Sequence, residues 1–151
     1  GEQAPCETEH SLMTSVIRAN ELIVVDLPRA FDGSVQTLAK ICDLVLVVVP
    51  AEVRGTAASC RIVCMVQGCV RDIRAVVRGP APAKLPACVI ADALGVPLAG
   101  ELRFEPGVAA ALDRGELPAV RSKGSLGSLS RRLLAEVLPS WTAECVAARN
   151  P

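Results

Sequence analysis

The sequence has very few of the side chains on which most enzyme active sites depend. It contains no Tyr, one Trp, two Phe and one His, and its 16 Lys and Arg balance 16 Asp and Glu. A single His10 near the amino terminus argues against a Ser-His-Asp or Cys-His arrangement for nucleophilic catalysis. Zero net charge and scarce aromatics likewise argue against a specific nucleic-acid platform.

A phosphate loop is also missing, because no Gly-Lys pair occurs anywhere in the sequence. The lysines, each preceded by Ala or Ser, are Lys40, Lys84 and Lys123. The G-x-x-x-x-G-K-[ST] pattern needs its Lys directly after Gly, so that backbone N–H groups cradle the phosphates. The longest apolar run, Leu44–Val49, is too short to cross a bilayer, and no signal-peptide pattern is present. We therefore expect a cytoplasmic protein.

Seven cysteines suggest either disulfides or a metal site. The seven cysteines are Cys6, Cys42, Cys60, Cys64, Cys69, Cys88 and Cys145. The odd count and the position of most of them inside apolar periodic segments argue against a disulfide framework. The spacing of Cys60, Cys64 and Cys69 differs from the close pairs of structural zinc sites. We interpret them as reduced thiols that act as small core hydrophobes.

What the chain does contain is a dense alternation of aliphatic strands and amphipathic helices. At 51% hydrophobic residues, it predicts one α/β domain over residues 1–151, with a mostly parallel sheet flanked by helices and a frayed segment 1–11. The predicted strands are Glu21–Asp26, Leu44–Val49 (buried on both faces), Ile73–Val77 and Val96–Leu102. The predicted helices are Leu12–Ala19, Val35–Cys42, Thr56–Gln67, Pro86–Leu94, Pro106–Arg114 and Ser128–Leu138, with a capped turn at Phe31–Ser34 and a loop at Glu116–Gly127.

Asp26 is the first candidate site residue, because it closes an aliphatic strand. In open α/β sheets, ligands bind outside the carboxyl ends of the strands. A rigidly held carboxylate at such a strand end suits Mg²⁺ bound to a nucleotide, since this hard cation prefers oxygen ligands. From this pattern alone, a turn-capping role for Asp26 is an equally good interpretation.

Four segments in order resemble the MinD/ParA family of ATPases. Glu21–Pro28 is similar to the Walker B region, in which an aliphatic run ends in Asp-x-Pro. The remaining three similar segments are Cys42–Val53, Ala93–Gly100 and Arg114–Pro118. The Asp-Leu-Pro-Arg variant most resembles the CpaE-like branch, which includes proteins described as septum site-determining. The resemblance implies a partial P-loop NTPase fold over about residues 14–138.

The resemblance also implies roles for four residues. Asp26 matches the carboxylate that orients Mg²⁺, and Pro28 and Arg29 lie in the segment that responds to the nucleotide state. Arg78 stands where the family has an Asn that contacts adenine, so it would have to stack on the base or pair with it instead. The implied cofactors are ATP or ADP with Mg²⁺, bound only in a full-length protein. The implied partners are a second copy in a homodimer and the machinery of division or of pilus assembly and secretion.

In that family, the strand with the phosphate loop lies between the Walker B strand and the next strand of the sequence. No such strand precedes Glu21, so we expect this chain to be the carboxyl-terminal half of a larger domain, unable to hydrolyse ATP alone. Two alternatives remain open: a non-enzymatic scaffold in which Asp26 only caps a turn, and a receiver-like signalling domain. For helix Ser128–Leu138, contact with a membrane is the alternative to packing on the sheet, and its apolar face with only two Arg suits the sheet better.

Overall fold

The computed structural model describes residues 15–28, 33–116 and 124–138. The chain divides into two compact units, which are considered separately. One unit consists of Gly1–Leu27 together with Leu134–Pro151, and the other of Pro28–Leu133. The second unit contains the whole sheet and most of the helices.

Three parallel strands form the sheet, in the order β1-β2-β3. Their bounds are Val45–Pro50 for β1, Ile73–Arg78 for β2 and Leu98–Leu102 for β3. The register places Pro50 beside Arg78 and Arg78 beside Leu102, so the three strands end at one level. The α/β fold with a parallel sheet flanked by helices is therefore confirmed.

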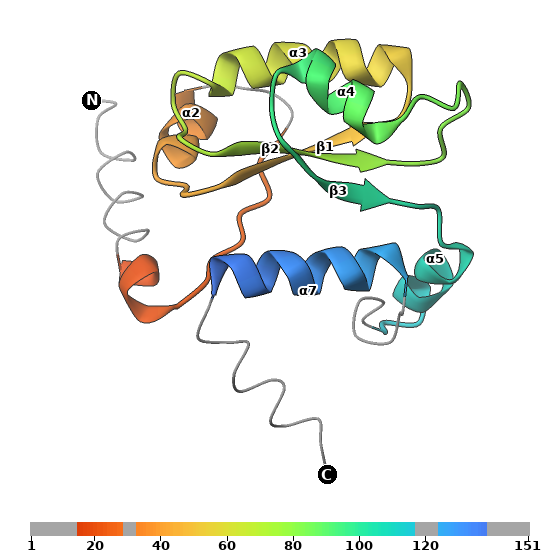
Figure 1. The fold of residues 1–151 in the computed structure, drawn as a ribbon. Helices are drawn as coiled ribbons and strands as arrows, with labels where there is room; N and C mark the ends of the chain where they lie inside the picture. Colours follow the sequence, from red (N-terminus) through yellow and green to blue (C-terminus); the bar gives the residue numbers. More distant parts are fainter. Residues whose placement is uncertain (1–14, 29–32, 117–123, 139–151) are drawn as a thin grey trace. The chain divides into compact units, whose positions relative to one another are not determined.

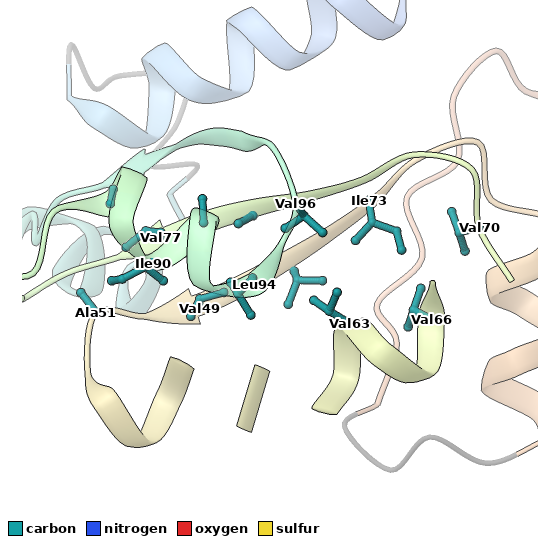
Figure 2. Close-up of a cluster of buried hydrophobic side chains, with 14 of the residues drawn as sticks. Val49, Ala51, Val63, Val66, Val70, Ile73, Val77, Ile90, Leu94 and Val96 are labelled. Carbon is teal, nitrogen blue, oxygen red and sulfur yellow. The ribbon is translucent and has the colours of Figure 1, made fainter. Parts of the chain in front are cut away.

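Helices α3 (Val53–Val66) and α4 (Ala87–Leu94) cover one face of the sheet (Figure 1). Between them and the strands lies the main core, which consists almost entirely of Val, Ile, Leu and Ala (Figure 2). Ile90 of α4 and Val49 of β1 are almost completely buried there. Full burial of such a side chain contributes roughly 1.5–3 kcal/mol, so this layer is the main source of stability.

Helix α7 (Ser125–Val137) packs on the opposite face of the sheet through its amino-terminal part (Figure 1). Leu129 is buried against Val76 and Ala99, with Leu133 partly buried beside them. The predicted packing of this apolar face on the sheet is thus confirmed for these two leucines. The helix begins at Ser125, so the prediction of a loop up to Gly127 is wrong.

The remaining helices follow the predicted order with shifted ends. They are α2 (Gly33–Lys40), α5 (Pro106–Asp113) and a short helical stretch at residues 15–19. The end of α4 follows the predicted pattern, because Gly95 adopts the left-handed conformation (φ 68°) that glycine tolerates best. The predicted residues 1–11, 12–14 and 31–32 lie outside the described residues.

The predicted strand Glu21–Asp26 is wrong in this structure. Residues 22–28 have no regular structure, and Val24 is 85% exposed. A strand needs a neighbour to pair with its backbone N–H and C=O groups, and the three-stranded sheet offers this segment none within the described residues. The local sequence favours a strand, but local preference alone does not supply the pairing.

The prediction that β1 is buried on both faces is also wrong. Val47 and Val49 face the main core and are buried, whereas Leu46 and Val48, on the other face, are 37% and 55% exposed. β1 lies at the edge of the sheet, and α7 packs on residues of β2 and β3 instead. One apolar face of β1 is therefore only partly covered by the described residues.

Candidate functional site

The carboxyl ends of the three strands form the edge of the sheet at which a parallel α/β fold binds its ligands. Arg78 is the last residue of β2, and its side chain is exposed at this edge. Arg103 follows β3 directly and is also exposed. Neighbouring strand ends therefore both carry guanidinium groups.

The other predicted site residues are divided between the two units or lie outside the described residues. Asp26 is exposed in the irregular segment 22–28, which belongs to the first unit up to Leu27. Pro28, also exposed, is assigned to the second unit together with Arg78. Arg29 lies outside the described residues. A shared site of Asp26, Pro28, Arg29 and Arg78 therefore stays a prediction.

A cavity of about 590 Å³ lies at the carboxyl end of β3, on the side of α7. Its walls come from the end of β3, the segment leading into α5, and the first two turns of α7. The lining residues are Glu101, Arg103, Phe104, Glu105, Gly124, Ser125, Ser128, Leu129 and Arg132. The sequence interpretation did not identify this cavity.

Glu105 connects the two walls of the cavity through the amino terminus of α7. Its Oε1 accepts hydrogen bonds from the backbone N–H of Leu126 (3.0 Å) and from the Ser125 hydroxyl (2.8 Å). The Leu126 N–H lowers the pKa of Glu105, and the Ser125 hydroxyl adds to this effect. The backbone N–H of Arg103 donates to the Ser125 Oγ (2.9 Å). A carboxylate here satisfies N–H groups that a helix leaves unpaired and complements the positive end of its dipole.

Two glycines allow α7 to approach this closely. A Cβ on Gly124 would overlap the Glu105 carboxylate, and a Cβ on Gly100 would lie 2.6 Å from both Leu129 Cδ1 and Arg132 Nη2. The guanidinium of Arg132 donates to the carbonyl oxygen of Ala99. The close packing of α7 on β3 thus depends on Glu105 at the amino end of the helix, on Arg132 within it, and on Gly100 in β3.

The sequence contained only faint signals for this arrangement. Glu105 and Ser125 are 20 positions apart, and nothing in local periodicity connects them. Ser125 is a residue type typical of helix starts, and this was the one signal that favoured a helix beginning at that position.

The thiols divide into two groups. Cys60 and Cys69 pack against the main core, while Cys64 and Cys88 are exposed, so the prediction of core thiols is only partly right. Burial raises the pKa of the Cys42 thiol, and the nearby Asp43 charge raises it further. Across the described residues, no three His, Cys, Asp or Glu side chains are grouped to hold a metal ion. None of the helices in the described ranges is long and apolar enough to span a membrane.

Comparison with known proteins gives a clear fold but no activity. No protein-family model matches the chain. Two uncharacterized proteins of Mycobacterium tuberculosis, from strains CDC 1551 / Oshkosh and ATCC 25618 / H37Rv, are each 37% identical over 122 residues, which cover 81% of this chain. The chain spans 34% of the length of these relatives.

Among solved structures, the MinD cell division protein of Aquifex aeolicus is similar, with a TM-score of 0.71 and 21% sequence identity. The match covers 82% of this chain and 58% of that protein. The fold is therefore MinD-like, in agreement with the resemblance of the sequence motifs.

Proposed function

We propose that this chain is the carboxyl-terminal part of a MinD/ParA-like nucleotide-switch protein of the CpaE-like, septum site-determining branch. In the whole protein, Asp26 would orient Mg²⁺ beside ATP or ADP, and the nucleotide state would control assembly of a homodimer in the cytoplasm. The switch would position division machinery or, alternatively, pilus or secretion machinery. The observation that carries the proposal is the MinD-like fold of the chain, which agrees with four motifs in the family order.

Two exposed features support a site that is divided between this chain and another segment. β1 has a bare edge and exposed Leu46 and Val48, and the aliphatic segment 22–28 has no strand neighbour in the described part of the chain. A phosphate-loop strand between them is the arrangement that the family resemblance implies. Such a strand would pair with both segments and satisfy their unpaired backbone groups.

The donor set of the chain fits only part of a Mg²⁺-nucleotide site. Mg²⁺ usually keeps several waters and uses one or two carboxylates together with substrate phosphates. Asp26 is a suitable single carboxylate, but the sequence has no Gly-Lys loop to hold the phosphates. This chain alone is therefore not expected to hydrolyse ATP.

The test is calorimetric titration of Mg-ATP and Mg-ADP into the native protein that contains this sequence. We expect binding that weakens in Asp26→Ala and is unchanged in the control Asp43→Ala. The exposed Asp43 precedes β1 and so lies at the amino-terminal ends of the strands, away from the carboxyl ends where ligands bind. A titration that stays flat at millimolar nucleotide, with no difference in Asp26→Ala, would exclude the nucleotide switch and favour a non-enzymatic scaffold.

The receiver-like alternative has weaker support. Such a domain needs an acidic pair after an earlier strand and a lysine at a late strand end. Lys84 instead lies in the loop between β2 and α4, with φ 51°. Stable labelling of Asp26 by a small phosphodonor such as acetyl phosphate would be the result in favour of that alternative.

A further inference from the structure

The cavity beside α7 contains two arginines, Arg103 and Arg132, that form no ion pair within the described residues. Arg103 is exposed, and within the described residues its guanidinium has no ion-pair partner. Arg132 donates a hydrogen bond to the carbonyl oxygen of Ala99, which has no net charge to offset that of the guanidinium. Glu101 and Glu105 are the acids nearest to Arg103 in sequence, and neither forms an ion pair with it in the described structure. Glu105 is bonded instead to Ser125 and Leu126 of α7, so its carboxylate leaves the Arg103 guanidinium available.

We propose that this cavity is an anion site that binds a phosphate group through Arg103 and Arg132. A guanidinium presents a planar fork of N–H donors that matches phosphate oxygens, and its charge-assisted hydrogen bonds are stronger than neutral ones. The hydroxyl of Ser128 lies exposed on the same wall and is a further donor. The site uses side chains of the β3 end and of α7, and it requires neither Asp26 nor a phosphate loop.

The acidic residues of the lining determine how strong this site can be. The negative charge of Glu105 is offset by the positive amino end of the α7 dipole. Glu105 accepts two hydrogen bonds there, from Ser125 and Leu126. Glu101 has no ion-pair partner among the described residues and lies in the same wall. It should repel an incoming anion, so its removal should strengthen binding.

The volume of the cavity leaves room for an organic phosphate as well as for a bare ion. Its volume of about 590 Å³ is well above what one phosphate fills and is in the usual range of small-molecule sites. Phe104 lines the cavity and is 71% exposed, so its side chain is accessible to an apolar or planar group of the ligand. Pyrophosphate and ADP share the diphosphate, so comparing them shows whether the additional group also binds.

The experiment is calorimetric titration of pyrophosphate and of ADP, each without Mg²⁺, into the native protein containing this sequence. We expect binding of both at millimolar concentration, about tenfold weaker in Arg103→Gln, as for the loss of one charge-assisted hydrogen bond. Arg103→Gln keeps the backbone bond to Ser125. The matched control is Arg131→Gln, which removes an exposed charge of α7 outside the lining and should leave the affinity unchanged.

A second variant tests the sign of the electrostatic effect. Glu101→Gln should tighten pyrophosphate binding, and raising the salt concentration should weaken it. The proposal is overturned if pyrophosphate and ADP fail to bind, or if Arg103→Gln and Arg131→Gln lower affinity equally, since that result indicates only general attraction to positive charge.

The outcome is separable from that of the nucleotide switch. Asp26→Ala should leave Mg²⁺-free pyrophosphate binding unchanged, because Asp26 does not line this cavity. Loss of this binding in Asp26→Ala, with circular dichroism unchanged, would place the ligand elsewhere and refute the anion site. Retained Mg²⁺-free binding, together with Mg-ATP binding that is the same in Asp26→Ala and weaker in Arg103→Gln, would refute the switch alone.

Discussion

The packing of α7 on β3 can be tested with a double-mutant cycle at Gly100 and Leu129. A Cβ on Gly100 would lie 2.6 Å from Leu129 Cδ1, well inside normal van der Waals contact. Overpacking of this kind costs about 1–3 kcal/mol, so Gly100→Ala should lower the free energy of unfolding by that amount. Leu129 is 7% exposed, and Leu129→Ala should cost about 2–4 kcal/mol through lost burial and a cavity.

The two changes should not be additive. Once Leu129 is truncated, the new methyl group at position 100 occupies part of the vacated space. Only the Arg132 guanidinium then remains close, and it is the end of a flexible side chain. The double variant should therefore be more stable than the sum of the single effects predicts, by at least about 1 kcal/mol.

Urea unfolding followed by circular dichroism gives the three free energies. The control is Gly107→Ala in α5, where a Cβ meets nothing within 4 Å and Ala is a better helix former. That variant should be neutral or slightly stabilising. Additive effects of Gly100→Ala and Leu129→Ala, or a harmless Gly100→Ala, would refute the close packing of α7 on β3.

Three further predictions concern the core, an ion pair and a thiol. Ile90→Ala should cost about 2–5 kcal/mol in urea unfolding, because Ile90 is 2% exposed, while Val89→Ala on the same helix should be nearly neutral at 48% exposure. The side-chain hydrogen bonds from Arg74 lower the pKa of Asp72, so this pair adds stability above the unfolded-state pKa of Asp72, and that stability is lost as pH falls through the folded-state value. Asp72→Asn should therefore destabilise by less than about 1 kcal/mol at neutral pH and reduce the loss of stability on acidification; an unchanged acid limb would contradict this. Cys64, exposed on α3, should be alkylated faster than the half-buried thiols in native protein, as read by mass spectrometry of digested peptides, and equal rates would contradict its exposure.

The sequence by itself determined the order and type of the elements from residue 33 onward. A parallel strand that helices cover needs aliphatic side chains at its buried positions. In β2 the buried positions are all aliphatic: Ile73, Ala75, Val76 and Val77. Gly95 ends α4 because a left-handed residue is needed there, a requirement that local sequence expresses directly. These signals act within a few residues of each other, so they can be recognised without the fold.

Only the tertiary structure decided which strands are paired and which faces are covered. Residues 22–25 and β1 are both aliphatic, yet β1 pairs with β2 while residues 22–25 have no strand partner in the described structure. The cavity beside α7 depends on Glu105 meeting Ser125 across 20 positions, and on glycine where β3 and α7 approach. Contacts between residues far apart in the sequence are set by the tertiary packing, and the local periodicity of the sequence does not predict them.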